Sequence, residues 1–556
     1  MPTIDVSYHD LCTLIGKKVS LKELREELIL YVKGEVDAAE GDTLKIDIKD
    51  TNRPDLWSAE GIAREIRNRI KGSKGVQTYA AQKSDITVRI TTRSRVQPLA
   101  VCAVAEKLAI DGHFLSQILQ LQEKIASSFG RKRRELSMGI YDMSRIKLPV
   151  VYTSRKPEDI LFVPLGFSKE MTAEEILQHH PKGREYGHLL RGEKEYPVWV
   201  DATGKILSMP PIINSESLGN VSAKTTHAFI EVTGHRLGFL STAINVLAAQ
   251  MLERGAAVKS VKTVWNKGSV VTPDFSKKTI EVSLDSIRKI SGLGLDNKNL
   301  LGLLRQAGYE VVAGKGSRLT LNYPSYRQDV MHWRDVAEDV AVSYGYNHIE
   351  PRIPRLPTSG KLLEKELFSE KMTEIMIGMG FQEILSYTLT NKNNLFSKMN
   401  MEEEKVAEIE NPSSANWGVF RTWLMPNLME FFSQNKHIDY PQSIFEIGDV
   451  VLLDEKMETK TRDRRKVAAA ISDAAINYDR ISSALDALMR NLAITYKLAR
   501  TNHASFIHGR VAGIIAAGKS IGIVGEISPH VLNNWGLEKP AVAFELDADA
   551  LFSVRK

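Results

Sequence analysis

The sequence predicts an α+β fold divided among several domains, and three observations support this prediction. The chain has 556 residues, which is too many for a single hydrophobic core. One succession of sequence patterns occurs twice, beginning at residues 5–16 and again at 281–292. Between and after the two copies, alternating strand patterns mix with amphipathic helices and are separated by glycine and proline turns.

The repeat rests on order and spacing. Residues 5–16 read DVSYHDLCTLIG, and residues 281–292 read EVSLDSIRKISG. A helical stretch, an alternating strand and a closing turn with an amphipathic helix follow in each copy, at 22–33, 44–48 and 52–66 in the first and at 297–308, 319–322 and 326–340 in the second. We therefore expect two duplicated small α+β domains, over residues 1–80 and 272–350.

A further α+β domain is predicted between the copies, over residues 84–265. Alternating or β-branched runs predict strands at 85–90, 100–110 and 196–201. The stretch 115–129 predicts a helix among them. After the second copy, residues 351–360 (PRIPRLPTSG) are poor in backbone donors and indicate a linker, so a last domain is expected over 358–556.

Composition excludes several classes of protein. Hydrophobic residues make up 43% of the chain and charged residues 26%, which is ordinary for a globular protein. The net charge of +6 permits an anionic partner without requiring one. The two cysteines are too few for a disulfide framework, no apolar run is long enough to span a membrane, and the N-terminus lacks a signal-peptide pattern. We expect a cytoplasmic chain.

Four carboxylates in the second copy form the clearest chemical signal. Asp335, Glu338 and Asp339 share one face of the predicted closing helix, and Asp329 lies in the turn before it. Clustered carboxylates repel one another unless a cation neutralises them, and oxygen-only ligation suits Mg²⁺. A solvated acidic face is the alternative. The first copy has Asp55, Gly61, Arg64 and Glu65 at the matching positions, so the fold does not require the four acids.

The ends of the two copies resemble a known family. The blocks NRPDLWSAEGIAREI and YRQDVMHWRDVAEDVAVSYGYNHIEP are similar to the paired small domains of phenylalanine–tRNA ligase β subunits of the archaeal and eukaryotic type. The resemblance implies a Mg²⁺ ion that is shared with an α subunit and bound at Asp329, Asp335, Glu338 and Asp339, the last being aspartate where many relatives have glutamate. It also implies an α2β2 heterotetramer in which the α subunit binds ATP and phenylalanine and charges tRNA(Phe).

The last domain contains the blocks FQEILSYTLTN (381–391), FRTWLMPNLMEFF (420–432), FEIGDVV (445–451) and HGRVAGIIAAGKSIGIVGEISP (508–529). With these blocks it resembles the antiparallel-sheet core of class II aminoacyl-tRNA synthetases. That chemistry needs an Arg-x-Glu pair and a second arginine after a glycine-rich strand. Here Arg421 is followed by Thr422 and Trp423, and no Gly-x-Gly-x-x-Arg occurs. We therefore expect a catalytically inactive module. Trp417, Phe420 and Trp423 are candidates for contact with the α subunit, and core packing would explain them equally well.

The resemblance further implies that the middle domain edits, by hydrolysing tRNA(Phe) mischarged with tyrosine. An apolar pocket rejects an added hydroxyl poorly, so a second site is needed. The candidate residues are Arg134 in the basic run 131–134, Ser208 and Asn214 around the turn at Pro210–Pro211, and Gln122 and Glu123 on a preceding helix. A solvated loop at 131–134 and a turn-forming Asn214 are the alternatives. Without a nucleophilic triad, we expect attack by water.

A second class of function is a non-catalytic nucleic-acid-binding or scaffold protein built on such domains. It predicts basic recognition helices in the duplicated domains. The first closing helix has mixed charge, with Glu60, Arg64 and Glu65, and the second is acidic. These charges disfavour contact with phosphates.

Overall fold

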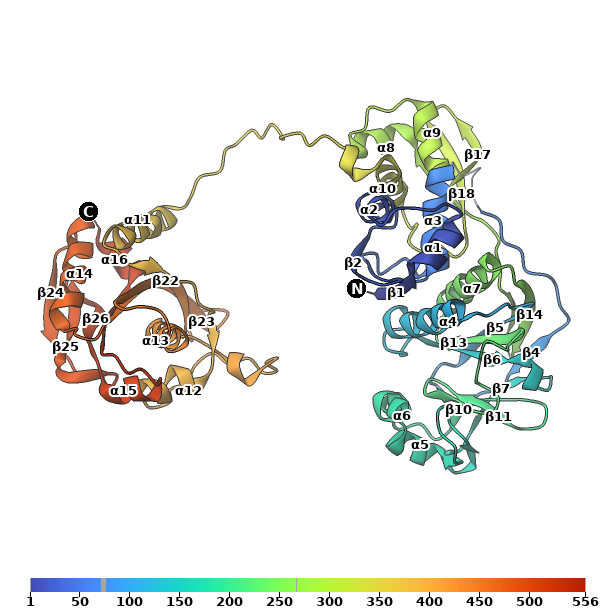
Figure 1. Ribbon diagram of the computed structural model, residues 1–556, viewed down its shortest axis with the longest axis horizontal. Coiled ribbons are helices and arrows are strands. Elements are labelled where there is room, and N and C mark those ends of the chain that lie inside the picture. Colours follow the sequence, from blue (N-terminus) through green and yellow to red (C-terminus); the bar gives the residue numbers. More distant parts are fainter. Residues whose placement is uncertain (1, 72–76, 267, 556) are drawn as a thin grey trace. The chain divides into compact units, whose positions relative to one another are not determined.

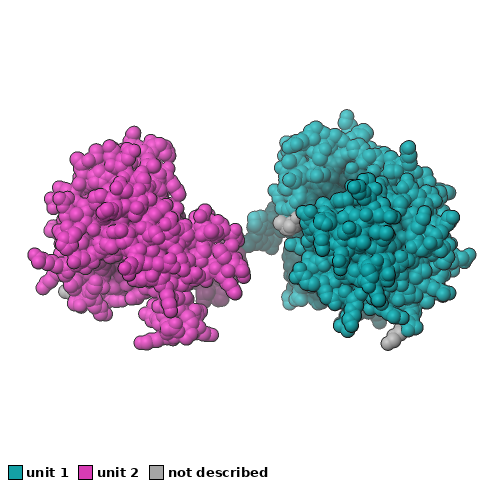
Figure 2. All heavy atoms as spheres, turned by 90° about the horizontal axis from the view of Figure 1, so that it is seen from below, with its two compact units in different colours: residues 1–352 teal, residues 353–556 magenta. Residues whose placement is uncertain are grey.

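The computed structural model describes residues 2–71, 77–266 and 268–555, and the chain forms two compact units, residues 1–352 and 353–556 (Figures 1 and 2). The boundary between the units lies within the predicted linker 351–360. Both units combine helices with sheets, so the α+β multidomain prediction is confirmed. In the described ranges, no helix has the length and apolar character needed to cross a membrane.

The two small domains have the same element order. The first contains β1 (Thr3–Ser7), α1 (Tyr8–Ile15), α2 (Leu21–Glu26), β2 (Gly34–Glu40), β3 (Thr43–Ile48) and α3 (Ala59–Lys71). The second contains β16 (Lys278–Ser283), α8 (Leu284–Ser291), α9 (Asn297–Gln306), β17 (Glu310–Lys315), β18 (Arg318–Tyr323) and α10 (Trp333–Tyr344). Their antiparallel sheets have the matching orders β1-β3-β2 and β16-β18-β17. The duplication is therefore visible in the topology.

Matching residues start and end the first helix of each small domain. Ser7 caps α1 and Ser283 caps α8, each with a side-chain oxygen that accepts from the backbone N–H three residues ahead. Gly16 and Gly292 follow these helices with φ of 73° and 69°. Glycine adopts this left-handed conformation without strain, so both helices stop at the same point of the pattern.

The middle domain has a mixed sheet that is ten-stranded in the described residues, with β15 paired to β14 and the others in the order β12-β11-β10-β7-β4-β14-β5-β13-β6. The strands are β4 (Thr87–Ile90), β5 (Leu99–Glu106), β6 (Leu136–Asp142), β7 (Val151–Arg155), β10 (Tyr196–Val200), β11 (Ile206–Met209), β12 (Ile213–Asn214), β13 (His227–Gly234), β14 (Ala257–Trp265) and β15 (Gly268–Thr272). Its helices include α4 (Gly112–Lys124), α5 (Ala173–His179), α6 (Pro181–Tyr186) and α7 (Leu237–Glu253).

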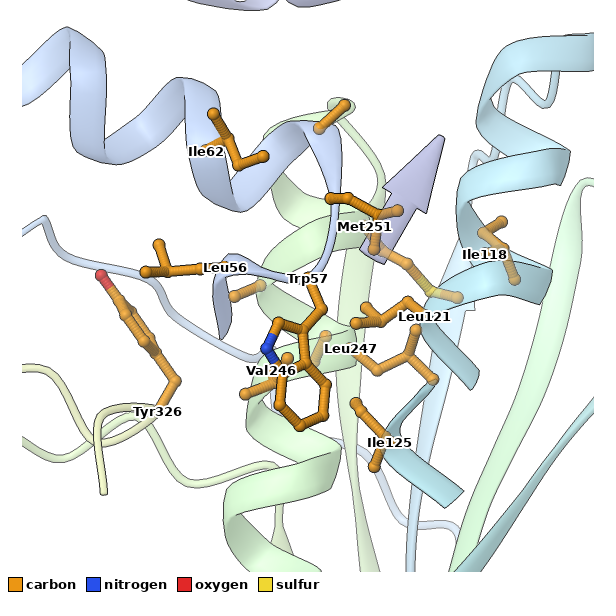
Figure 3. Packing of buried hydrophobic residues seen from close by; sticks show 14 of the residues in the cluster. Leu56, Trp57, Ile62, Ile118, Leu121, Ile125, Val246, Leu247, Met251 and Tyr326 are labelled. Atoms are coloured by element: carbon orange, nitrogen blue, oxygen red, sulfur yellow. The ribbon is translucent and has the colours of Figure 1, made fainter. Parts of the chain in front are cut away.

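One hydrophobic core joins the first small domain to the middle domain. Trp57, which follows β3 in the chain, is fully buried against α4 and α7 (Figure 3). Leu121 of α4 and Val246 and Leu247 of α7 lie beside its indole ring. Burial of a side chain as large as tryptophan stabilises the contact by a few kcal/mol, on the order of 2 to 3. The first small domain and the middle domain therefore share one core, whereas the second small domain has a core of its own.

The second unit contains a seven-stranded sheet, counted within the described residues, in the order β19-β22-β23-β27-β26-β25-β24. The strands are β19 (Gln382–Glu383), β22 (Gln442–Leu453), β23 (Thr461–Ser472), β24 (Tyr496–Arg500), β25 (Phe506–Ala516), β26 (Lys519–Ile527) and β27 (Ala541–Asp547). Apart from the parallel β19–β22 pair, the strands are antiparallel, as the sequence predicts.

Helices cover both faces of this sheet. The helices α11 (Glu364–Gly378), α14 (Tyr478–Asn491) and α16 (Ala548–Val554) pack on one face, and α13 (Met425–Gln434) packs on the other. Strand β23 shows the consequence, because Val467 and Ala469 face one core and Ala468 and Ala470 face the other. A strand buried on both faces reads as a continuous apolar run, and residues 467–471 (VAAAI) have this pattern.

Candidate functional sites

A cavity of about 260 Å³ with polar and apolar walls lies in the middle domain. Its walls come from the end of α4, the loop before β6, the β11–β12 hairpin and strand β13. Four residues predicted from the sequence line it, namely Gln122, Glu123, Ser208 and Asn214. The fold thus gathers side chains from two segments that are far apart in the sequence.

The β11–β12 hairpin fixes the two candidate residues that it carries. Ser208 and Asn214 are direct partners in its antiparallel register, and Pro210 and Pro211 restrict the backbone of the turn between them. Pro210 and Pro211 also line the cavity. A rigid turn therefore holds the hydroxyl and the carboxamide on one wall.

The end of α4 supplies another part of the lining. Gln122 donates a hydrogen bond from Nε2 to the carbonyl of Met138, at 2.8 Å. The side-chain oxygen of Gln122 takes no part in this bond. Glu123 is neutralised by two cations, with Arg133 at 3.0 Å and Lys182 at 3.3 Å. These three charged residues line the cavity, and Glu123 remains partly exposed.

As a correction to the sequence prediction, Arg133 rather than Arg134 reaches the cavity. Arg131, Lys132 and Arg133 have φ of 50°, 53° and 63°, a left-handed run that turns the chain sharply. Arg134 is left exposed, whereas the Arg133 guanidinium donates to the carbonyls of Pro211 and Ile212, at 2.9 and 2.8 Å. Arg133 also stacks on Tyr186, with 4.3 Å to the ring centroid. Backbone conformation, which the basic run does not encode, decides between the two arginines.

The cavity also contains Glu231, which the sequence predictions omit. It lies on β13 and is 2% exposed. Burial raises the pKa of Glu231 to about 8, although the Tyr141 hydroxyl, 3.0 Å from Oε1, favours the charged form. Among the described residues, Oε2 has no hydrogen-bond partner. A single glutamate within the apolar strand HAFIEVTG was the available signal, because a buried carboxyl needs a reason to be there.

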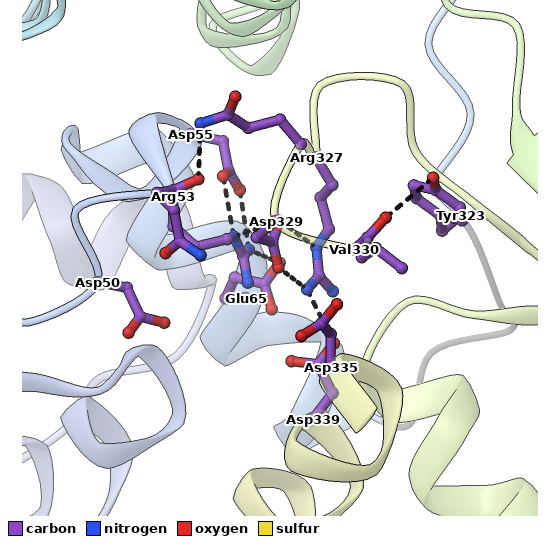
Figure 4. A network of polar contacts seen from close by, with 12 residues as sticks. Asp50, Arg53, Asp55, Glu65, Tyr323, Arg327, Asp329, Val330, Asp335 and Asp339 are labelled. Atoms are coloured by element: carbon purple, nitrogen blue, oxygen red, sulfur yellow. Dashed lines mark hydrogen bonds and ion pairs between the residues drawn. The ribbon is translucent and has the colours of Figure 1, made fainter. Parts of the chain in front are cut away.

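A buried charge cluster joins the two small domains (Figure 4). Arg53 donates to both carboxylate oxygens of Asp55 and to Glu65, and Arg327 donates to both oxygens of Asp329. Arg327 also pairs with Asp339 at 2.8 Å. Burial opposes ionisation of Asp329, but Arg327 and Arg53 hold its pKa below the ordinary value.

Asp335 and Glu338 have partners other than the two arginines of this cluster. The Oδ2 atom of Asp335 accepts the backbone N–H groups of Met331 and His332, at 2.8 and 2.6 Å, and so caps α10. Glu338 is half-exposed and pairs with Lys33 of the first small domain at 2.6 Å. The helix face predicted from the sequence is present, but each carboxylate on it has a different partner.

The four predicted Mg²⁺ ligands therefore do not converge within this chain alone. Within residues 2–71, 77–266 and 268–555, no group of three or more His, Cys, Asp and Glu side chains could hold a metal ion. Arginines neutralise Asp329 and Asp339, so these two carboxylates do not fit a metal site in their present arrangement. Asp335 and Glu338 use one oxygen each in their bonds. The magnesium site stays a prediction.

The family models and the similar proteins that match this chain agree on one family. Residues 280–346 match the tRNA synthetase B5 domain, and residues 349–548 match the phenylalanyl tRNA synthetase beta chain CLM domain. The phenylalanine–tRNA ligase β subunit of Pyrococcus furiosus is 45% identical over 557 residues, covering 99% of this chain and 100% of the relative. That of Pyrococcus horikoshii is 46% identical over 551 residues, covering 98% and 99%.

This chain belongs to the phenylalanine–tRNA ligase β-subunit family. The family resemblance predicted from the repeat ends is confirmed, and with it the class of protein, a ligase subunit of the aminoacyl-tRNA synthetases that serve protein biosynthesis. A crystal structure of an N-terminal fragment of the Pyrococcus horikoshii β subunit superposes with a TM-score of 0.60 at 46% identity. It covers 62% of this chain and 100% of the fragment.

Arg421, the arginine considered for the class II Arg-x-Glu pair, is bound by other groups of this β-subunit-family chain. Arg421 is 3% exposed, pairs with the buried Glu446 at 2.7 Å and donates to the Asp449 carbonyl at 3.0 Å. Gly448 is packed against the same guanidinium, since an added Cβ would lie 2.4 Å from Nη2. Of the aromatic residues considered for a partner contact, Trp423 is buried and Trp417 is 40% exposed.

Proposed function

We propose that this chain is the β subunit of an α2β2 phenylalanine–tRNA ligase, in which an α subunit binds ATP and phenylalanine and charges tRNA(Phe). The similarity over nearly the full length to β subunits supports this role. The Arg421–Glu446 pair supports the assignment of aminoacylation to another chain, because a guanidinium buried against a carboxylate cannot also bind a nucleotide phosphate. The free thiols Cys12 and Cys102 suit a reducing, cytoplasmic location.

We further propose that the middle domain hydrolyses tyrosine esters of tRNA(Phe). The observation that supports this activity is the convergence of Ser208, Asn214 and Glu231 on one cavity. A phenol hydroxyl that enters such a cavity finds hydrogen-bond partners, whereas a phenylalanyl ring would leave these buried polar groups unpaired. The cavity therefore favours the mischarged amino acid over the correct one.

Water is the proposed nucleophile. The side chains that line the cavity include Ser208 but, in the part of the chain that the structure describes, no histidine or cysteine. A serine without an adjacent base is a poor nucleophile. Asn214 and Ser208 can instead hold the ester carbonyl and a water molecule through hydrogen bonds, which positions the attack and stabilises the developing oxyanion.

The test uses the assembled complex of this chain with its α subunit. Deacylation of Tyr-tRNA(Phe) and charging with phenylalanine are measured for the native complex and for the double variant Ser208→Ala, Asn214→Ala. We expect deacylation to fall by about 100-fold or more while charging is retained, as the loss of two positioned polar groups predicts. The exposed Arg134→Ala is the matched control. Unchanged deacylation in the double variant would remove the cavity from the reaction.

For the metal, we propose that Mg²⁺ binds where the α subunit adds ligands to Asp335 and Glu338, with Asp329 and Asp339 supporting the helix that carries them. Asp335 and Glu338 each have one carboxylate oxygen that takes no part in the bonds to their partners. Two such carboxylates suit Mg²⁺, which commonly binds few protein oxygens and keeps several waters. Glu338→Gln keeps the side-chain shape on a half-exposed position. A Mg²⁺ titration of complex assembly should shift to higher concentration in this variant, and an unchanged titration would favour the solvated-face alternative.

A further inference from the structure

A fully buried tyrosine lies beneath the floor of the cavity. Tyr141 is on β6, beside β13, and does not itself line the cavity. Its hydroxyl nevertheless contacts three side chains that do, the Ser208 Oγ at 2.7 Å, the Glu231 Oε1 at 3.0 Å and the Asn214 Oδ1 at 3.5 Å. These side chains come from three different strands, so one phenol hydroxyl is common to the polar groups of the cavity.

Gly139 makes this arrangement sterically possible. It lies two residues before Tyr141 on the same strand, and an added Cβ would lie 2.3 Å from the Tyr141 hydroxyl and 2.6 Å from the Glu231 Oε1. No real Cβ atom tolerates contacts of this length. The space above Gly139 is therefore filled by the two polar groups, and any larger residue would separate them.

The hydroxyl of Tyr141 has one proton and so can donate to one neighbour only. When Glu231 is ionised, it is the strongest acceptor, and Tyr141 donates to it and accepts from the Ser208 hydroxyl. When Glu231 is protonated, Tyr141 is free to donate to Ser208 or Asn214. The proton of the Ser208 hydroxyl therefore points toward Tyr141 in one state and is available to the cavity in the other.

The surroundings of Glu231 determine which state is present. Burial raises the pKa of Glu231 to about 8 and also raises that of Tyr141, so the phenol remains protonated. The other titratable groups on which the charge of Glu231 acts are Cys102, its register partner on the adjacent strand β5, and Tyr152 of β7. Arg133, Lys182 and Glu123 are the charged groups that line the cavity around it.

We propose that Tyr141 is a positioning residue for the hydrolytic cavity. Its hydroxyl couples Glu231 to Ser208 and so sets whether the serine hydroxyl donates to the bound tyrosyl ester. This inference rests on the proposed editing function. The residue acts through its neighbours and does not touch the substrate. Removal of its hydroxyl alone should uncouple the two cavity residues while leaving the packing of the ring in place.

The experiment compares Tyr141→Phe with Tyr152→Phe in the assembled complex. Tyr152 is an equally buried tyrosine, and its hydroxyl donates to the Gln97 carbonyl at 2.9 Å, away from Ser208. We expect Tyr141→Phe to slow deacylation of Tyr-tRNA(Phe) by about 10-fold to 100-fold, the range that loss of a hydrogen bond to a charged group predicts. Tyr152→Phe should change the deacylation rate by less than about 3-fold. Both variants should charge tRNA(Phe) with phenylalanine at the rate of the native complex.

Two further measurements separate positioning from general damage. The rate of the native complex should change with pH as Glu231 ionises, and this change should be flattened in Tyr141→Phe but retained in Tyr152→Phe. In a Ser208→Ala background, Tyr141→Phe should add little, since its effect passes through the missing hydroxyl. Equal effects of the two tyrosine variants, or full additivity with Ser208→Ala, would overturn the inference. If the native complex itself does not deacylate Tyr-tRNA(Phe), the proposed function fails instead.

Discussion

The Nε atom of Arg53 lies 3.6 Å from the Oδ1 atom of Asp329, so a buried arginine of the first small domain contributes to the neutralisation of a carboxylate in the second. Arg53 and Arg327 are equivalent residues of the duplicated domains. Each holds the aspartate two positions ahead of it with two hydrogen bonds. The duplication has thus placed two copies of one ion pair against each other, with Arg53 acting in both.

The first prediction concerns this cluster. Arg53→Ala leaves Asp55 and Glu65 buried without their shared cation. Removal of one member of a buried ion pair costs up to about 3 to 5 kcal/mol, and the second arginine that each of these carboxylates keeps lowers this cost. We expect a clear decrease in the urea midpoint of the full chain. Lys17→Ala, which breaks the half-exposed pair with Glu23, is the control and should cost about 1 kcal/mol or less. Equal midpoints for the two variants would contradict the structural role of the cluster.

The second prediction is a pH dependence of stability caused by Glu231. Its pKa is raised from 4.5 to about 8, so between these values the folded chain keeps a proton that the unfolded chain has released. This contribution to stability is present at low pH and is lost as pH rises toward 8, at about 1.4 kcal/mol per pH unit. Glu231→Gln cannot ionise, so its stability relative to the native chain should increase from pH 5 to pH 8.

Thermal melting of the full chain at a series of pH values measures this difference. Glu158→Gln, on an exposed turn, is the matched control, and its melting temperature should follow that of the native chain at every pH. A constant difference between Glu231→Gln and the native chain would show that Glu231 is already ionised at pH 5.

The third prediction separates the two neighbouring arginines. Arg133→Ala removes the hydrogen bonds to the carbonyls of Pro211 and Ile212 and the pair with Glu123. The wall that carries Ser208 and Asn214 should loosen, and we expect deacylation of Tyr-tRNA(Phe) to fall by about 10-fold or more. Arg134→Ala should have less than about a 2-fold effect, since its side chain is exposed. The opposite order would support the prediction made from the basic run alone.

The fourth prediction concerns the inactive module. Because Arg421 is bound by Glu446 and the Asp449 carbonyl, the chain without an α subunit should neither bind ATP nor form phenylalanyl-tRNA. Arg421→Ala should lower the stability of residues 353–556 by about 3 to 5 kcal/mol through the unpaired Glu446. In the assembled complex, the KM for ATP should be unchanged. A large increase in that KM would place Arg421 in a nucleotide site and contradict our description of the module.

Several features of the fold follow directly from local sequence. The caps Ser7 and Ser283 and the terminating glycines Gly16 and Gly292 act within a few residues, so the sequence suffices to predict the repeated helix. The spacing of Asp335, Glu338 and Asp339 likewise predicts one helix face, and α10 confirms it. Their partners were not predictable, because Lys33 and Arg327 approach this face through tertiary contacts.

The family, the duplication and the absence of class II signatures can be predicted from the sequence, since each depends on residue order or on local periodicity. Three relationships become visible in the folded chain alone: Arg53 supports Asp329, Arg133 turns inward where Arg134 does not, and Tyr141 lies beneath the cavity. These relationships depend on backbone conformation and on the pairing of distant strands. A hydrogen bond acts over about 3 Å whatever the separation in sequence, so the neighbours of a buried polar group are set by the fold.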